Sequence, residues 1–232
     1  MFEIVPSINA PDWETAGRQL ELIAPHTDWV ELDISNNTFA PTVTWNNPED
    51  LRTFQTELHL RVAVHLMVRE PESVVERWIN GGVRRVIVHY ETLAEKKGFM
   101  GMFGGAETRK KIQALSEQCH ENWVEFGLSF LWNTPTNAIQ PYLDLVDVVQ
   151  ILAVDPGPSG QEFHKEALTA AEFLRSLQSQ FKFKIEWDGG VTRSNIRQIK
   201  NAGVNIAAVT SAVFGAGEPQ RALEVLKQEA LS

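Results

Sequence analysis

The stretch Ile185-Glu186-Trp187-Asp188-Gly189-Gly190-Val191 predicts a strand that ends in a carboxylate and is followed by two glycines before a helix begins. A carboxylate at such a point lies at the mouth of a site, and glycines let backbone N–H groups approach a phosphate because they carry no Cβ. Two other strands end in reactive residues, Trp29-Val30-Glu31-Leu32-Asp33 and Val62-Ala63-Val64-His65-Leu66-Met67. Acids and a histidine at the carboxyl ends of separate parallel strands are typical of the active face of a barrel enzyme.

Strand-like runs alternate with amphipathic helical runs along the chain. Strands separated by helices pair in parallel through right-handed crossovers. Eight such units in 232 residues match a closed (β/α)₈ TIM barrel, an α/β fold, whereas a doubly wound sheet more often has five to seven strands. We therefore expect one barrel domain over residues 1–232. The expected strands are residues 2–8, 28–34, 60–67, 84–89, 124–131, 147–153, 182–187 and 205–211, and the expected helices lie near 12–24, 48–58, 71–80, 107–120, 136–144, 163–179, 193–201 and 217–230.

Composition and charge narrow the partners that the chain can have. A formal net charge of −9 disfavours nucleic acid and anionic membrane surfaces as partners. A small anionic substrate would then need local positive potential, from backbone amides or from a metal ion. The single cysteine, Cys119, suits a reducing compartment. The chain has no run of ~18 apolar residues, and a strand-like run from Phe2 leaves no room for a signal peptide. We expect a cytoplasmic protein.

The strand-end residues form a candidate metal site. Side chains at positions i and i+2 of a strand share a face, so Glu31 points with Asp33, and Glu186 with Asp188. If the terminal residues face the barrel axis, Asp33, His65 and Asp188 converge at its top. Two carboxylates and an imidazole suit one divalent cation, with Glu31 as a possible fourth ligand. Each residue taken alone is better explained as a strand cap, but the three together favour a functional site.

Three loops rich in small residues indicate a phosphate site. Residues 155–161 follow the sixth strand, Gly189-Gly190 follows the seventh, and residues 210–212 end the eighth. Phosphate in barrel enzymes commonly lies between these late loops and a helix N-terminus. A single glycine-rich turn is usually only a turn, whereas three adjacent loops of this kind are more specific. The sequence therefore predicts a small phosphorylated substrate.

Other features have plainer interpretations. His89 ends the fourth strand without metal-type spacing, and we expect a hydrogen-bonded wall residue. Lys184, two residues before Glu186, is interpreted as a paired interior charge, and Ser7 as a group that hydrogen-bonds a ligand. Residues 92–106 after the fourth strand form a long loop with glycines and aromatic residues. This loop could equally be a lid over the substrate or a segment ordered against a neighbouring subunit.

These motifs resemble the ribulose-phosphate 3-epimerase family. The resemblance runs over nearly the whole chain. It rests on Val5-Pro6-Ser7-Ile8, Trp29-Val30-Glu31-Leu32-Asp33, Val64-His65-Leu66-Met67, Pro71-Glu72, Val154-Asp155-Pro156-Gly157, Gly160-Gln161-Glu162-Phe163, Asp188-Gly189-Gly190-Val191 and Ser211-Ala212-Val213-Phe214.

The resemblance implies a TIM barrel of the ribulose-phosphate binding type and a metal-dependent proton transfer at C3 of a ketose phosphate, interconverting ribulose 5-phosphate and xylulose 5-phosphate. Asp33 and Asp188 would be the two acid/base groups, acting on opposite faces of the substrate through an enediolate. By analogy with the family, we also expect a homo-oligomer. The implied metal ligands are Glu31, Asp33, His65 and Asp188, and the implied substrate-binding residues are Ser7, His65, Gly157, Gly160, Gly189, Gly190 and Ser211.

The chain also departs from the family pattern. Glu31 stands where the family has histidine, so three carboxylates and one divalent cation would leave a net charge of about −1. This change shifts the expected metal from Zn²⁺ towards Mn²⁺, Fe²⁺ or Mg²⁺. Residues 35–42 after the second strand, together with Leu131-Trp132 and Pro158, predict a remodelled pocket.

These departures keep three alternatives open. The chain could epimerise a different phosphorylated sugar, or bind a sugar phosphate without turnover. A related barrel decarboxylase ranks last, because the third strand ends in His65 and offers no lysine among the acidic residues.

Overall fold

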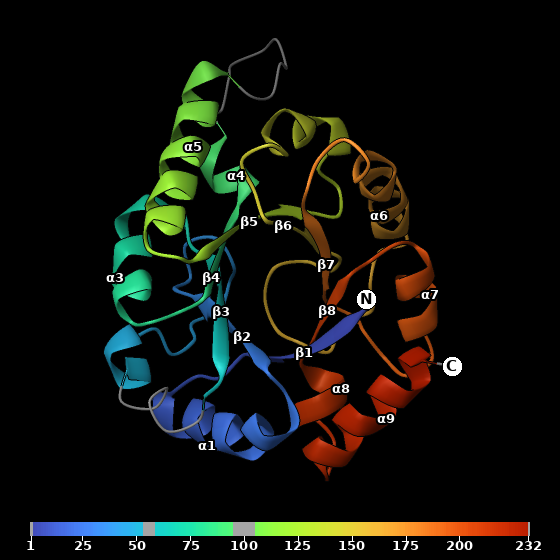
Figure 1. Cartoon of the computed structure of the whole chain (residues 1–232). Helices are drawn as coiled ribbons and strands as arrows, with labels where there is room; N and C mark the ends of the chain where they lie inside the picture. The colour runs from blue at the N-terminus through green and yellow to red at the C-terminus, as the bar shows by residue number, and fades with distance from the viewer. Residues whose placement is uncertain (1, 53–58, 95–104, 232) are drawn as a thin grey trace.

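Eight parallel strands close into a barrel in the computed structural model, which describes residues 2–52, 59–94 and 105–231 (Figure 1). Each strand pairs with its sequence neighbours, and β1 pairs with β8 to close the ring. The sequence prediction of a (β/α)₈ fold is confirmed. The strands are β1 (Glu3–Ile8), β2 (Trp29–Ser35), β3 (Arg61–Met67), β4 (Arg85–His89), β5 (Glu125–Leu131), β6 (Val148–Leu152), β7 (Lys184–Asp188) and β8 (Ile206–Val209).

Helices surround the barrel (Figure 1). Local signals explain where some of them begin; α1, for example, starts after Asp12, whose side chain accepts a hydrogen bond from the Thr15 N–H. The helices are α1 (Trp13–Ile23), α3 (Val75–Asn80), α4 (Tyr90–Leu93), α5 (Ala106–Glu121), α6 (Glu166–Leu177), α7 (Ile196–Asn201), α8 (Ser211–Phe214) and α9 (Pro219–Leu231), and residues 48–52 are also helical. No helix in the described ranges has the length and apolar character needed to cross a membrane.

The expected helix over residues 136–144 is not an α-helix. The structure has two short 3₁₀ helices there, η3 (Thr136–Ala138) and η4 (Gln140–Tyr142). Pro141 explains the break, because proline has no N–H to continue an α-helical ladder and its ring crowds the preceding turn. The expected loop over residues 92–106 falls largely on residues 95–104, which lie outside the described residues, so its role as a lid stays a prediction.

Strand alternation divides the apolar residues into two clusters. Side chains such as Val30, Leu32 and Val64 point outward and pack under the helices in the main core. A smaller cluster fills the barrel interior at the amino ends of the strands. It consists of Val5, Trp29, Ala63 and Ile206.

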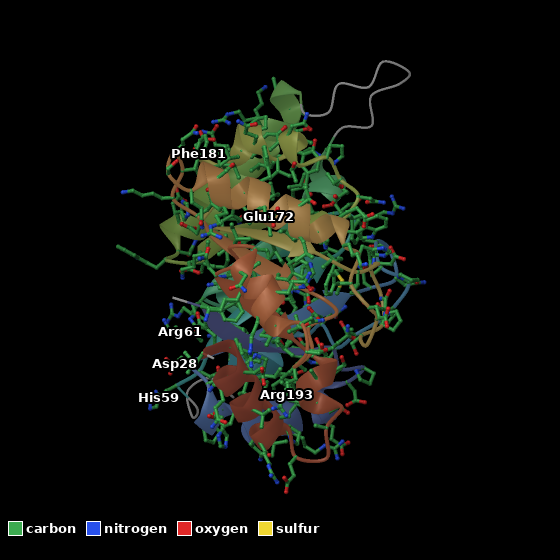
Figure 2. All side chains as sticks on the ribbon, turned by 90° about the vertical axis from the view of Figure 1, so that its right-hand side faces the viewer. Asp28, His59, Arg61, Glu172, Phe181 and Arg193 are labelled. Carbon is green, nitrogen blue, oxygen red and sulfur yellow. The ribbon has the colours of Figure 1, made fainter. Side chains whose placement is uncertain are left out.

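The amino-terminal rim carries surface charges that contribute little to stability. Figure 2 shows Asp28, His59 and Arg61 close together at this rim, where β2 and β3 begin. The Arg61 guanidinium lies 3.6 Å from the Asp28 carboxylate, but both side chains are more than half exposed. Exposed pairs of this kind contribute about 0–1 kcal/mol. The buried apolar residues inside this end of the barrel, including Trp29, are therefore expected to stabilise the fold more than this exposed pair.

We expect Trp29→Ala to lower the free energy of unfolding by about 3–5 kcal/mol, because it opens a cavity that the surrounding strands cannot collapse to fill. Trp123→Ala is the matched control, since Trp123 is 89% exposed; its effect should stay within about 0.5 kcal/mol. Urea denaturation of both variants measures the difference. Equal losses in the two variants would show that the inner cluster does not stabilise the barrel.

Candidate active site

Four buried side chains converge at the carboxyl ends of the strands. Glu31 and Asp33 come from β2, His65 from β3 and Asp188 from β7. One ligand atom from each lies within 4.8 Å of all the others. His65 is at the centre, with its Nδ1 3.4 Å from Asp33 Oδ1 and 3.3 Å from Asp188 Oδ2. The structure thus brings together the four residues that the sequence singled out as metal ligands.

The four residues fit a divalent cation. Asp33 Oδ1 and His65 Nδ1 are buried polar atoms without a hydrogen-bond partner in the described part of the chain. Buried polar atoms of this kind destabilise a fold unless something satisfies them. A cation placed among three carboxylates and one imidazole would satisfy both atoms. Oxygen-rich sets with one nitrogen suit Mn²⁺, Fe²⁺ or Mg²⁺ better than sulfur-seeking metals.

A chain of hydrogen bonds orients His65. Its Nε2 lies 2.8 Å from the Nε2 of His89, and the His89 Nδ1 lies 3.3 Å from Glu91 Oε2. If Nδ1 of His65 binds a cation, Nε2–H of His65 must donate to His89, and Nδ1–H of His89 must then donate to Glu91. Glu91 is itself fixed by bonds from the Leu131 N–H and the Thr134 hydroxyl.

His89 is therefore more than the wall residue expected from the sequence. Glu91 follows two residues later, at the start of α4, and lies within hydrogen-bonding distance of His89. The contact between His65 and His89 depends on the pairing of β3 with β4. This pairing brings the two rings together, with their centroids 4.9 Å apart.

Burial and neighbouring charges shift the pKa values of the site. Burial, together with the charges of Glu186 and Asp188, raises the pKa of Glu31 well above its usual range. Burial alone would lower the pKa of His65, but the neighbouring carboxylates of Asp188 and Asp33 raise it to about 9. Without a cation, His65 therefore holds a proton at neutral pH.

Two further shifts bear on proton transfer. Burial and the charge of Asp33 raise the pKa of Asp188 to about 6, against the opposing effect of His65. A carboxyl with this pKa can both accept and donate a proton near neutral pH. Burial lowers the pKa of His89 to about 4. His89 is consequently neutral at pH 7, as the hydrogen-bond chain from His65 requires.

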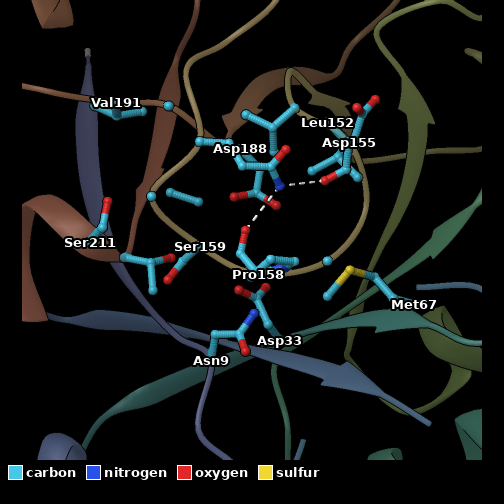
Figure 3. Close-up of a pocket in the computed structure, with 18 residues that line it drawn as sticks. Asn9, Asp33, Met67, Leu152, Asp155, Pro158, Ser159, Asp188, Val191 and Ser211 are labelled. Atoms are coloured by element: carbon cyan, nitrogen blue, oxygen red, sulfur yellow. Dashed lines mark hydrogen bonds between the residues drawn. The ribbon is translucent and has the colours of Figure 1, made fainter. Parts of the chain in front are cut away.

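A pocket opens beside the cluster, lined by the loops that follow β6, β7 and β8. In Figure 3 the carboxylates of Asp33 and Asp188 point towards one another within it. Of the residues expected to bind substrate, Gly157, Gly160, Gly189, Gly190 and Ser211 line this pocket, whereas Ser7 and His65 are not among its lining residues.

Ser7 contacts an acid rather than the open pocket. Its hydroxyl donates a 3.0 Å hydrogen bond to Asp33 Oδ2, and its side chain is fully buried. The bond fixes one oxygen of Asp33 and leaves Oδ1 directed at His65. Ser7 therefore orients the carboxylate.

The glycines after β7 are required by the backbone. Gly189 and Gly190 have φ values of 98° and 68°, in the left-handed region. A Cβ at Gly189 would lie 2.5 Å from a methyl carbon of Val154, and one at Gly190 would lie 2.6 Å from the Phe163 nitrogen. Only glycine allows this turn to pack against the neighbouring loop and to present its backbone to the pocket.

The loop after β6 is tied from two sides. Gln161 donates hydrogen bonds to the Asp155 and Pro158 carbonyls, at 2.8 and 2.9 Å, which Figure 3 shows as dashed lines. From β5, Trp132 stacks on His164 with ring centroids 3.8 Å apart, and its Nε1–H donates to Asp155 Oδ1. Trp132 therefore holds this loop at the mouth of the pocket.

Lys184 does not occupy the interior position expected from the sequence. It lies at the exposed start of β7, with its Nζ 3.6 Å from Glu125 Oε1 and about half of its side chain exposed. The interior partner of Glu186 is Arg85 instead.

Comparison with known proteins assigns these features to a family of enzymes. The profile of the ribulose-phosphate 3 epimerase family matches residues 3–214. The ribulose-phosphate 3-epimerase of Schizosaccharomyces pombe is 25% identical over 99% of this chain and 94% of its own length. The chloroplastic ribulose-5-phosphate-3-epimerase of Arabidopsis thaliana is 30% identical over 97% of this chain and 75% of its own length.

Solved structures share the fold. The 3-keto-L-gulonate-6-phosphate decarboxylase of Vibrio cholerae superposes with a TM-score of 0.72, covering 99% of this chain and 97% of that one. At 13% identity, this similarity concerns the barrel architecture alone.

We expect the affinity for Mn²⁺ to rise with pH, because a cation must displace the proton of His65. Since the pKa of His65 is about 9 in the metal-free chain, this proton is bound at pH 6 to 8. Each unit of rising pH in that range should therefore increase the apparent affinity about tenfold or more. Electron paramagnetic resonance (EPR) titration of free Mn²⁺ at pH 6, 7 and 8 measures this slope. An affinity that does not change with pH would contradict binding through His65.

Proposed function

The chain belongs to the ribulose-phosphate 3 epimerase family, and on that premise we propose that it inverts C3 of a ketose phosphate, interconverting ribulose 5-phosphate and xylulose 5-phosphate. The observation that carries this proposal is the pair Asp33 and Asp188, whose carboxylates face one another at the pocket with His65 between them. Inversion of a C–H centre requires proton access from both sides of the carbon. Two carboxylates carried by separate strands, β2 and β7, would supply that access.

Asp33 and Asp188 differ in the surroundings that suit each of them to proton transfer. Asp33 is oriented by the Ser7 hydroxyl, and Asp188 has a pKa of about 6. In one direction of the reaction, one carboxylate removes the C3 proton from one face, and the other carboxyl group donates a proton to the opposite face. In the reverse direction the roles exchange. The pKa of about 6 suits Asp188 to act as the acid in one direction and as the base in the other.

We propose that Glu31, Asp33, His65 and Asp188 hold one divalent cation. The four ligand atoms lie within 4.8 Å of each other, and two of them lack other partners in the described chain. When bound, the cation would supply Lewis-acid stabilisation of the negative charge that develops as C3 loses its proton. The three carboxylates favour Mn²⁺, Fe²⁺ or Mg²⁺ over Zn²⁺.

The late loops support binding of the phosphate. The described lining residues of the pocket include neither lysine nor arginine. A phosphate in a chain with net charge −9 would then be held by backbone N–H groups, as in other anion-binding nests. Gly160, Gly189 and Gly190, all with positive φ, bring backbone close to the pocket without a Cβ in between.

Binding of a sugar phosphate without turnover is the second candidate. One observation favours it: Glu31 adds a third buried carboxyl group beside Asp33 and Asp188, which would be negatively charged once it binds a cation. That charge weakens the electrostatic stabilisation of an enediolate. The retained pair of facing acids and His65 argues for catalysis, and for this reason we place the epimerase first.

Proton NMR in D₂O distinguishes the two candidates. Purified, Mn²⁺-loaded protein is incubated with ribulose 5-phosphate, and the C3 proton signal is followed against a protein-free control. Loss of this signal with the appearance of xylulose 5-phosphate is the expected result. Absence of exchange, together with thermal stabilisation by the same sugar phosphate, would overturn the epimerase and support the binding protein. Exchange without xylulose 5-phosphate would overturn this substrate and favour another phosphorylated sugar.

We expect Asp188→Asn to lower kcat by at least about 10²-fold, because it removes one of two groups that must exchange protons with C3. Measurement at saturating Mn²⁺ separates this loss from weaker metal binding, and circular dichroism checks the fold. Asp28→Asn is the matched control, since Asp28 lies 84% exposed at the other end of the barrel. Full activity of Asp188→Asn would refute the two-base mechanism.

A further inference from the structure

A continuous chain of buried polar side chains runs beneath the metal cluster. The Gln150 amide nitrogen lies 3.2 Å from Glu31 Oε2 and 3.0 Å from Glu186 Oε1. The other carboxylate oxygen of Glu186 accepts a 2.9 Å bond from Arg85 Nη1. Arg85 in turn donates through Nε and Nη2 to Glu125 Oε2 at the amino-terminal rim. This chain therefore connects a proposed metal ligand to the far end of the barrel.

The barrel register explains how Arg85 reaches Glu186 across the interior. Arg85 on β4 is level with Ala63 on β3, whose small side chain leaves room in the barrel interior. The Arg85 guanidinium lies 4.4 Å from the centre of the Trp29 ring, which covers it from below. Arg85 is 1% exposed, and so is Glu186. The pair thus places a buried cation beside a carboxylate that would otherwise be unpaired.

Gln150 joins this ion pair to the cluster. A primary amide has two N–H donors, and Gln150 directs its nitrogen at two carboxylates, Glu31 and Glu186. A neutral donor between two carboxylates separates their charges and fixes the plane of each. Gln150 and Glu31 are both fully buried, so no bulk water replaces this contact.

We propose that Gln150 and Arg85 are positioning residues for the metal site, holding the carboxyl group of Glu31 in an orientation aimed at the cluster. Arg85 compensates the charge of Glu186 and fixes its carboxylate. Gln150, which donates hydrogen bonds to both Glu186 and Glu31, thereby fixes the orientation of the Glu31 carboxylate. The inference rests on the proposed metal site and extends it to residues that touch neither metal nor substrate. It explains how a fourth carboxylate, Glu186, is accommodated below three others in one barrel.

The test measures Mn²⁺ binding to the full-length chain, after removal of metal with a chelator, by EPR of the free ion. Gln150→Met keeps nearly the same length and removes both donors. We expect it to raise the Kd for Mn²⁺ about 10- to 100-fold, as for other residues that orient a metal ligand. Ser129→Ala is the matched control. Ser129 is the strand neighbour of Gln150 in the register, is buried, and has a hydroxyl without a partner in the described residues.

A double-mutant cycle separates positioning from general damage to the barrel. If Gln150 acts through Glu31, Gln150→Met should add little, about twofold at most, to the effect of Glu31→Gln. Independent effects that multiply in the double variant would overturn the inference, and so would an unchanged Kd in Gln150→Met.

Arg85→Lys keeps a cation but loses the guanidinium geometry that contacts Glu186 and Glu125 at the same time, and we expect a rise in the Kd for Mn²⁺ of several-fold. This variant provides the decisive measurement if Gln150→Met does not fold.

The outcomes also distinguish this inference from the proposed function. A wild-type chain that binds no Mn²⁺ overturns the metal site and with it the inference. Tight binding by the wild type, with equal binding by Gln150→Met and Arg85→Lys, overturns the inference alone. Loss of affinity in these variants supports it, whichever sugar phosphate the enzyme uses.

Discussion

The interior of this barrel is crowded with charge that has been removed from water. A buried carboxylate or guanidinium is tolerated only where a partner compensates it. The organisation of the interior follows from that constraint. Arg85 compensates Glu186, and Gln150 bridges Glu186 to Glu31. At the next level, the carboxylates of Asp33 and Asp188 face His65, which leaves a position suited to a cation.

The two ends of the barrel consequently have different roles, one in packing the interior and the other in forming the candidate site. At the amino-terminal end, Trp29 and its apolar neighbours fill the interior and cover the Arg85 guanidinium. At the carboxyl end, β2, β3 and β7 carry the acids and the histidine of the cluster, and the loops beyond the strands form the pocket. This separation keeps the groups that need precise placement on rigid strands, and leaves the loops to determine which substrate fits.

Side-chain contacts hold the loop after β6 in place at the pocket. Trp132 stacks on His164 and bonds to Asp155, so that β5 holds the loop after β6. Pro158 lies in this loop, and its carbonyl is held by Gln161. The aromatic stack and these hydrogen bonds fix the position of the loop at the pocket mouth.

The local sequence pattern was sufficient to predict the barrel fold and the acidic residues that meet at the site. The alternation of strands and helices predicted eight βα units, and the positions of Glu31, Asp33, His65 and Asp188 near strand ends predicted that they would meet. Both predictions depend on periodicities of two and 3.6 residues, which the sequence shows directly. Their roles as ligands, acids and bases stay predictions.

Only the tertiary structure brought the supporting residues together. Arg85 and Glu186 are 101 positions apart, and Gln150 and Glu31 are 119 apart. No short-range pattern records which residues of a closed barrel lie at the same level, because that depends on how the strands are staggered around the ring. The same reason explains why the sequence predicted His89 to be hydrogen-bonded but did not identify His65 as its partner, and why Lys184 was wrongly predicted to lie in the interior. Sequence periodicity determines which way a side chain points, whereas the closure of the barrel decides what it meets there.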